Sequence, residues 1–246
     1  MNRDHITLGN FTMDSLDQLI RNAAAFGDIG SRIAFLSAHL IGTEYAEATL
    51  VGSSDIPEAF VINLQGVDCF TFLEYVEAMR LSGSFPEFSE NLQRVRYRDG
   101  IVDFSRRNHF FTDWKEWNAG HISDVTENVG SSAVRKVTKR LNDREDGTLF
   151  LPGIMPVQRD IRYIPSERID DAVKASLRTG DYAGIYTELK GLDVSHVGIV
   201  IREGETLRLR HASSQKQMKK VVDQDFSNYM SDKPGILVFR PVMNSA

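Results

Sequence analysis

A single cysteine and two histidines are the residues of this sequence whose types and spacing favour covalent chemistry. Cys69 follows Asp68 where apolar residues begin to recur at helical spacing. Asp68 is a favourable N-cap residue, so we expect Cys69 at the first helical position, where unpaired N–H groups and the helix dipole favour a thiolate. The charge of Asp68 opposes that shift, and a lone cysteine is otherwise typically a small buried hydrophobic residue. A nucleophilic role for Cys69 therefore needs a base from elsewhere in the chain.

The C-terminal part of the sequence offers that base in a predicted hairpin. Residues 196–201 and 206–211 have the composition of strands, and we expect Glu203 and Gly204 to form the turn between them. With this turn, His196 and His211 lie opposite each other on one face, with Cβ atoms about 5 Å apart. One imidazole could then act as the base while the other orients it, which is what a thiol nucleophile needs. A turn one residue longer would make the two histidines diagonal neighbours.

Two other interpretations of the paired histidines stay open. They could form half of a metal site, with His109 or Asp113 as further ligands, although neither an HxxxH nor an HxH spacing supports this. They could also be structural histidines whose ring nitrogens are hydrogen-bonded within the sheet.

The densest aromatic cluster lies in residues 108–118. Its composition favours core packing, and the alternative is an aromatic and polar wall of a substrate cleft. If this segment is helical, His109 and Asp113 share one face because they are four residues apart.

Helical patterns precede strand patterns along the chain. Amphipathic helices are predicted at 14–26 and at 31–41, the second capped by Ser31. A short strand at 60–64 leads towards Cys69, and the Asp-Gly pair within 92–104 predicts a hairpin. Residues 128–147 are expected to be a surface excursion, and the strands are concentrated after residue 180. This order predicts an α+β fold with segregated layers.

Composition excludes several classes of protein. The 246 residues carry a formal net charge of −5, so a nucleic-acid partner is not expected. The single cysteine excludes an intramolecular disulfide framework and a cysteine-based structural zinc site. No apolar run approaches the roughly 20 residues that span a bilayer, and Met1–His5 lacks a signal-peptide pattern.

The order of three segments resembles the NlpC-type papain-like cell-wall hydrolases. These segments are Val67-Asp68-Cys69-Phe70-Thr71-Phe72, residues 195–200 and residues 209–214. Residues 42–45, 108–114 and 124–126 further resemble the N-acetylmuramoyl-L-alanine amidase-like branch. The resemblance runs from about Ile33 to Phe239. The general family often has Ser-Gly after Asp-Cys, whereas this chain has Phe-Thr, which favours the amidase branch.

The resemblance implies a papain-like α+β fold, with N-terminal helices packed on a C-terminal antiparallel sheet. It implies one domain over residues 1–246, with a family-specific insertion around 105–165. The implied activity is cleavage of the amide bond between N-acetylmuramic acid and L-alanine in peptidoglycan or muropeptides. Cys69 is then the nucleophile, His196 the general base and acid, and His211 the residue that orients His196. A D-glutamyl-diamino-acid endopeptidase on the same scaffold is the nearer alternative, and a non-catalytic binding module with an inert cysteine is the more distant one.

The resemblance also implies the surroundings of the reaction. The oxyanion is expected at the Cys69 backbone N–H and the Tyr45 hydroxyl. The expected substrate contacts are Tyr45, Asp68, His109, Phe110, Asp113, Trp114 and Ser195. No metal or cofactor is implied, and a monomer is expected. Because peptidoglycan lies outside the cytoplasmic membrane, we expect a periplasmic or exported protein whose signal segment is missing from this sequence, with a cytoplasmic location left open.

Overall fold

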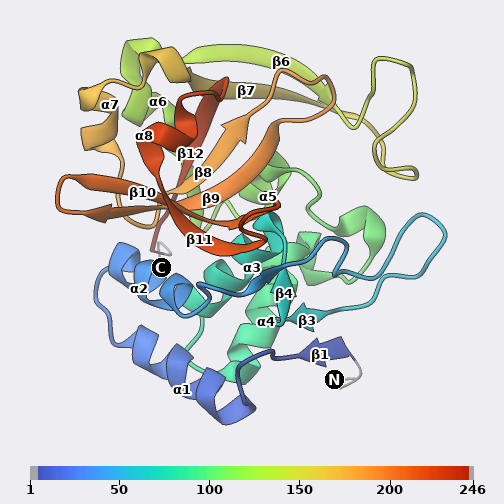
Figure 1. The fold of residues 1–246 in the computed structure, drawn as a ribbon. Helices are drawn as coiled ribbons and strands as arrows, with labels where there is room; N and C mark the ends of the chain where they lie inside the picture. Colours follow the sequence, from blue (N-terminus) through green and yellow to red (C-terminus); the bar gives the residue numbers. More distant parts are fainter. Residues whose placement is uncertain (1–4, 244–246) are drawn as a thin grey trace. The chain divides into compact units, whose positions relative to one another are not determined.

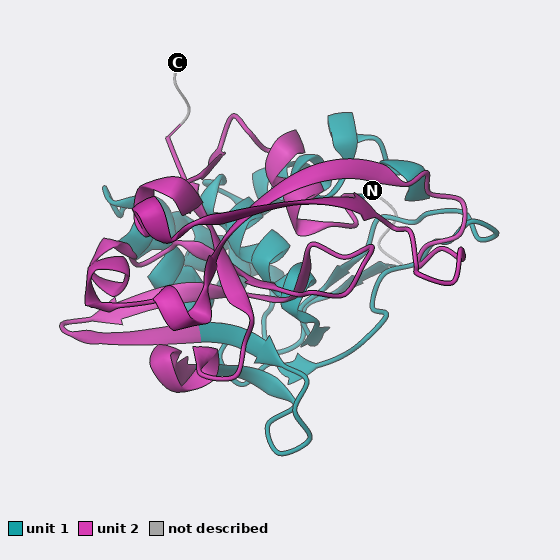
Figure 2. Cartoon of the chain, turned by 90° about the horizontal axis from the view of Figure 1, so that it is seen from above, with its two compact units in different colours: residues 1–107, 210–223 teal, residues 108–209, 224–246 magenta. Residues whose placement is uncertain are grey.

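The computed structural model describes residues 5–243, and the chain divides into two compact units (Figure 2). Unit 1 comprises residues 1–107 and 210–223, and unit 2 comprises residues 108–209 and 224–246. Most of the N-terminal segment considered for a signal peptide, residues 1–4, lies outside the described residues. The mixed α+β class is confirmed by the helices and sheets described below. One domain with an insertion around 105–165 stays a prediction.

Side-chain caps set where the helices of unit 1 begin. These helices are α1 (Met13–Ala24), α2 (Ile29–Ala38), α3 (Cys69–Arg80) and α4 (Phe85–Arg96), with the 3-10 turns η2 (Arg98–Gly100) and η3 (Phe104–Arg106) after them (Figure 1). Helix α2 starts earlier than predicted, because Asp28 is its N-cap and accepts a hydrogen bond from the Ser31 amide at 2.7 Å. Ser31 is therefore inside the helix, and the prediction that it caps the helix is wrong.

Helix α4 extends to Arg96 and so occupies the start of the region in which residues 92–104 predicted a hairpin. Ser84 caps the helix, and Leu92 and Val95 are buried on one of its faces. The Asp99–Gly100 pair does reverse the chain, with φ angles of 56° and 66°, but it does so in a 3-10 turn after the helix. The hairpin prediction is wrong because the apolar residues before the turn follow helical rather than alternating spacing.

Short strands complete unit 1. They are β1 (Ile6–Thr7), β2 (Glu44–Tyr45), β3 (Ile62–Asn63), β4 (Gly66–Val67) and β11 (Lys220–Asp225), the last belonging to this unit up to residue 223. β1 and β3 pair in parallel, and β2 lies between β4 and β11. The parallel pairing of β2 with β4 places Tyr45 opposite Val67, two residues before Cys69. The strand predicted at 60–64 corresponds to the shorter β3.

Unit 2 is built on an antiparallel sheet. Its strands are β5 (Ile122–Asp124), β6 (Arg135–Leu141), β7 (Val157–Pro165), β8 (Tyr182–Tyr186), β9 (Val194–Glu203), β12 (Gly235–Pro241) and residues 206–209 of β10 (Thr206–Ser213). β8 lies between β9 and β12, while β12 also pairs with β5 and β7, and β7 pairs with β6. A buried apolar core, which includes Ile185, Val200 and Val238, lies against this sheet.

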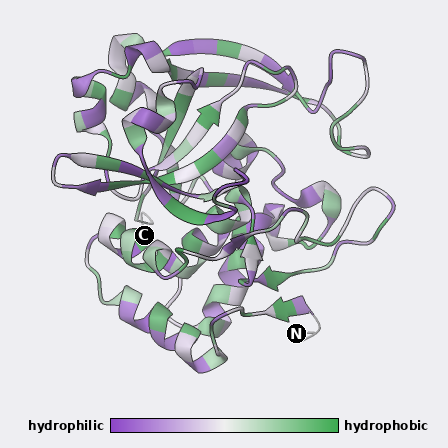
Figure 3. Ribbon diagram, viewed as in Figure 1, coloured by the Kyte–Doolittle hydropathy of each residue, from purple (hydrophilic) through white to green (hydrophobic). Residues whose placement is uncertain are grey.

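Short helices accompany the sheet of unit 2. They are α5 (Phe111–Trp117), α6 (Thr126–Gly130), α7 (Asp171–Ser176) and α8 (Phe226–Met230), with the 3-10 turns η4 (Ser131–Ala133) and η5 (Ser166–Arg168). The segment 128–147, expected to be a surface excursion, contains most of α6 and the whole of β6. Figure 3 shows hydrophilic and hydrophobic residues mixed along β6, which is why its sequence did not predict a strand. No helix among residues 5–243 has both the length and the apolar character needed to cross a bilayer.

The hairpin turn lies one residue later than predicted. β9 ends at Glu203 and β10 begins at Thr206, so Gly204 and Glu205 form the turn, with Gly204 at a φ of +60°. The direct opposition of His196 and His211 depended on the earlier turn and no longer follows from this hairpin.

Candidate active site

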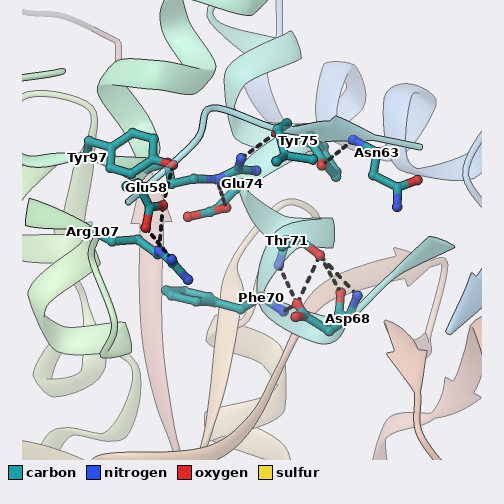
Figure 4. A network of polar contacts seen from close by, with 11 residues as sticks. Glu58, Asn63, Asp68, Phe70, Thr71, Glu74, Tyr75, Tyr97 and Arg107 are labelled. Atoms are coloured by element: carbon teal, nitrogen blue, oxygen red, sulfur yellow. Dashed lines mark hydrogen bonds and ion pairs between the residues drawn. The ribbon is translucent and has the colours of Figure 1, made fainter. Parts of the chain in front are cut away.

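Cys69 is the first residue of α3, as predicted. Asp68 is the N-cap: its Oδ1 accepts hydrogen bonds from the amides of Phe70 and Thr71 at 2.9 and 2.7 Å (Figure 4). The Thr71 hydroxyl oxygen accepts the Asp68 amide proton at 3.0 Å, which completes a capping box. Cys69 itself is half-buried. The cap fixes the position of the Asp68 carboxylate, and the predicted contact of Asp68 with substrate stays a prediction.

The backbone that leads into α3 is fixed by a polar network. The Asn63 amide donates to the Tyr75 hydroxyl at 2.8 Å (Figure 4), and Asn63 Oδ1 accepts the amide protons of Gln65 and Gly66 at 3.0 and 3.3 Å. Tyr75 is a fully buried residue of α3. The chain just before Cys69 is therefore tied to the same helix that Cys69 begins.

A buried ion pair fastens α3 to α4. Arg96 Nε donates to Glu74 Oε2 at 2.7 Å, and Arg96 Nη1 donates to the Val61 carbonyl at 2.6 Å. Burial raises the pKa of Glu74, although the charge of Arg96 opposes that rise. This pair was not predicted from the sequence. A glutamate within the apolar stretch of α3 was the available signal, since buried charges are normally paired.

Tyr45 lies near the N-terminus of α3, where Cys69 is located. The Ala46 amide donates to the Val67 carbonyl at 3.0 Å, which holds β2 beside the residues that precede Cys69. The pKa of Tyr45 is raised to about 12, first by burial and then by the negative charges of Cys69 and Asp68. Lys219 Nζ lies 4.8 Å from the centre of the Tyr45 ring. Tyr45 therefore keeps its phenolic proton at neutral pH and can donate a hydrogen bond near the thiol.

His211 is a buried residue of β10 within unit 1. Its neighbour Arg210 forms a two-bond ion pair with Asp223, each nitrogen–oxygen distance being 2.7 Å. Arg210 also donates to the Ser37 hydroxyl at 2.9 Å and thereby joins this strand to α2. The backbone that carries His211 is thus held on both sides within unit 1.

His196 belongs to unit 2, where it pairs with Ile185 of β8. Its ring is half-buried, and its centre lies 6.2 Å from that of Tyr229 on α8. Ser195 is exposed, and its hydroxyl donates to the Ile185 carbonyl at 3.4 Å. The catalytic roles predicted for Cys69, His196 and His211 stay predictions.

The aromatic segment 108–118 is largely core. Trp114 is fully buried with its ring 5.4 Å from that of Tyr182, and Phe110 is 4% exposed. Asp113 is buried and forms an ion pair with Arg159, with 2.6 Å between Arg159 Nη2 and Asp113 Oδ1. This burial favours the packing interpretation over the wall of a substrate cleft. His109 is half-buried and precedes the start of α5, so it does not share a helical face with Asp113 as proposed.

No group of three histidine, cysteine, aspartate or glutamate side chains in the described part of the chain is arranged to hold a metal ion.

Comparison with known proteins identifies the family to which this chain is similar. A family model described as AmiA-like, N-acetylmuramoyl-L-alanine amidase-like, matches residues 35–236. A crystal structure of an N-acetylmuramoyl-L-alanine amidase from Bacteroides uniformis is similar, with 29% identity, a TM-score of 0.73 and coverage of 88% of this chain and 100% of that one. No curated protein matches the chain.

Two further solved structures share the fold. A Legionella pneumophila protein is 21% identical with a TM-score of 0.79, and the match covers 94% of each chain. A Bacteroides fragilis protein put forward as a xylanase is 29% identical with a TM-score of 0.66, over 83% of this chain and 98% of that one.

Proposed function

This chain belongs to the N-acetylmuramoyl-L-alanine amidase-like family, and from that premise we propose that it is a cell-wall amidase with a cysteine nucleophile. The proposed bond is the amide between N-acetylmuramic acid and L-alanine, in peptidoglycan or in muropeptide fragments. The likeness to the Bacteroides uniformis protein of that name supports this substrate. The observation that carries the cysteine mechanism is the position of Cys69, at the first residue of a capped helix near a tyrosine that keeps its proton.

The proposed chemistry has two steps. The Cys69 thiolate attacks the lactyl carbonyl carbon, and the His196 imidazolium gives its proton to the departing L-alanine amine. The resulting thioester is then hydrolysed by a water molecule whose proton His196 accepts. His211 orients the His196 ring and stabilises its charged form. The products are a muramic acid with a free lactyl carboxylate and a peptide with a free L-alanine amine. We also propose that the chain has the papain-like, NlpC-type fold.

The oxyanion of each tetrahedral intermediate needs hydrogen-bond donors. The Cys69 amide lies at the N-terminus of α3, where backbone N–H groups point along the helix axis and the positive end of the helix dipole favours a negative charge. The Tyr45 hydroxyl is the second proposed donor, because β2 holds Tyr45 beside the residues that precede Cys69 and a phenol keeps its proton at neutral pH. This substrate also implies an exported protein.

Mass spectrometry of digested muropeptides tests the proposal. Intact muropeptides and anhydro-muropeptides should yield a free stem peptide that begins with L-alanine, and a Cys69→Ala variant with wild-type circular dichroism should yield none. A cut between D-glutamate and the diamino acid would instead identify the endopeptidase activity. Equal cleavage by the Cys69→Ala variant would contradict a cysteine mechanism, and no cleavage by the wild type would favour a binding module.

A further inference from the structure

The segment between β8 and β9, residues 187–193, is fastened by one half-buried and one buried charged side chain, just before the strand that carries His196. We propose that Lys139 and Asp193 are positioning residues, which fix the first residues of β9 and thereby the orientation of the His196 imidazole. This inference rests on the proposed function, because it matters for catalysis only if His196 transfers protons. The contacts that support it all lie within unit 2.

The ladder between β8 and β9 is interrupted beside His196. Ile185 pairs with His196, but the next residue, Tyr186, pairs with Val194, so Ser195 is an extra residue in β9. A bulge of this kind leaves one residue without a partner and bends the strand, and bulges are common where a side chain must be aimed at an active site. The ladder alone therefore does not determine the direction of the His196 side chain. The segment that enters β9 must contribute.

Asp193 supplies the first attachment of that segment. Its side chain is almost fully buried, and its Oδ2 accepts hydrogen bonds from the Thr112 amide at 2.7 Å and the Thr112 hydroxyl at 2.8 Å. The N-cap residue of α5, Phe110, offers no side-chain cap, so Asp193 serves the helix in its place. Its other oxygen accepts the Val194 amide at 2.8 Å. One carboxylate thus ties the start of β9 to the start of α5.

Lys139 supplies the second attachment, from β6. Its ammonium donates to the carbonyls of Leu189 and Leu192, each at 3.0 Å, and also to that of Thr187. The same ammonium lies 4.7 Å from the centre of the Tyr186 ring. Three carbonyls from one segment converge on a single cation, so residues 187–192 cannot shift without breaking a charge-assisted hydrogen bond.

The charge of Asp193 favours the ammonium form of Lys139. Burial lowers the pKa of Lys139, while the charges of Asp193 and Glu188 raise it. Burial likewise raises the pKa of Asp193, against the hydrogen bonds from Thr112 and Val194. Polar groups held in this way impose strict geometry on their partners, because a misplaced partner leaves a buried polar group without its hydrogen bond. That property suits a segment that must hold a catalytic side chain at a fixed angle.

Lys139→Met and Asp193→Asn test the proposal, and Arg202→Met is the matched control. Arg202 also donates to backbone carbonyls, those of Lys174 and Leu177, but it lies near the opposite end of β9 from His196. The measurements are kcat, KM and the pH dependence of Cys69 alkylation by iodoacetamide. Both test variants should lower kcat about 10- to 100-fold with little change in KM, as small misplacements of catalytic groups do. The alkylation midpoint should also rise towards the free-thiol value of about 8.5.

The control variant should lose stability yet keep the wild-type kcat and alkylation profile. If Lys139→Met and Asp193→Asn behave like this control, the attachments are structural only and the proposal fails. Thr112→Val, which removes one of the three hydrogen bonds to Asp193, provides a milder variant if Asp193→Asn does not fold. A His196→Ala variant tests the catalytic role of His196 separately from the positioning role of Lys139 and Asp193. If this variant leaves kcat and the alkylation profile unchanged, the assignment of His196 as the base fails, and the positioning proposal fails with it.

Discussion

At the scale of single residues, the proposed chemistry depends on which groups carry protons near the start of α3. The Cys69 sulfur must be able to ionise, whereas the Tyr45 hydroxyl must not. The raised pKa of Tyr45, about 12, has burial as its first cause and the charge of Cys69 as its second. An ionised Cys69 thiol raises the pKa of the Tyr45 phenol, because two adjacent anions would repel each other.

Replacing Tyr45 with phenylalanine should remove one oxyanion donor while the aromatic ring still fills its site. We expect kcat to fall about 100-fold with KM nearly unchanged, because a lost donor of this kind weakens the transition state more than the bound substrate. Steady-state kinetics on a muropeptide measures this. Tyr97→Phe is the control: its hydroxyl donates to Glu58 at 2.7 Å in the same unit, so it should change stability and leave kcat unaltered. A wild-type kcat in Tyr45→Phe would remove Tyr45 from the mechanism.

The raised pKa of Tyr45 also predicts how stability responds to alkaline pH. A phenol whose pKa is higher in the folded state favours folding below the unfolded value of about 10, and this contribution is lost as pH rises from about 10 through about 12. Urea unfolding of wild type and Tyr45→Phe should therefore differ by a constant amount below pH 10. Between pH 10 and 12 the wild type should lose stability faster. Parallel curves across that range would contradict the raised pKa.

At the scale of elements, the pair of Arg96 and Glu74 holds the helix that begins with Cys69. Arg96→Met should cost about 3 to 5 kcal/mol, because it leaves the Glu74 carboxylate buried without its partner. The double variant Arg96→Met, Glu74→Leu should be more stable than the single one, since no unpaired charge remains. It should still fall short of the wild type by about 1 to 3 kcal/mol, because the Val61 carbonyl loses its donor.

Urea denaturation of the three proteins measures these differences. A double variant less stable than Arg96→Met would show that the pair is held by packing rather than by charge. The Arg80→Met variant is not a suitable control, because Arg80 also pairs with a buried glutamate of α3, Glu77. Arg94→Met is suitable, since its ion pair with Glu90 on α4 is exposed, and we expect it to change stability by less than about 1 kcal/mol.

Several elements could be predicted from the sequence because one local signal determined them. Asp68 before Cys69 predicted the start of α3, and the cap has the expected hydrogen bonds. For other elements, the sequence was equally compatible with two local structures. Gly204 can occupy either central position of a two-residue turn, and only pairing along the whole of β9 decides which one. β6 could not be predicted, because residues 135–140 carry charges on both faces and show no alternation.

The same distinction applies to the candidate site. The position of Cys69 follows from its own neighbours in sequence, whereas the burial of Trp114 depends on Tyr182 and other residues far along the chain. Aromatic residues suit a core and a cleft wall equally well, so composition could not separate the two. The attachments made by Lys139 and Asp193 join β6, α5 and β9, and no local pattern predicts contacts of that range.

At the scale of the whole molecule, the proposed triad draws on residues far apart in the sequence, with Cys69 and His211 in unit 1 and His196 in unit 2. The proposal therefore requires the Cys69 sulfur to come within reach of a His196 ring nitrogen in the working enzyme. A short bifunctional alkylating reagent, 1,3-dibromoacetone, tests this requirement. It reacts first with a thiolate and then with a nearby imidazole, and it leaves a three-carbon bridge between them.

Mass spectrometry of the digested product should find one bridge, from Cys69 to His196. The His196→Ala variant should give Cys69 that is alkylated but not bridged to residue 196. The chain has six histidines, and His39 serves as an internal control, because it is the exposed C-cap residue of α2 and is not part of the proposed site. A bridge from Cys69 to His211 alone would exchange the roles of the two histidines, since the imidazole nearest the sulfur is the one that can accept its proton. A native protein in which Cys69 is alkylated without any bridge would contradict the triad itself, and Cys69 would then be a reactive thiol without a base.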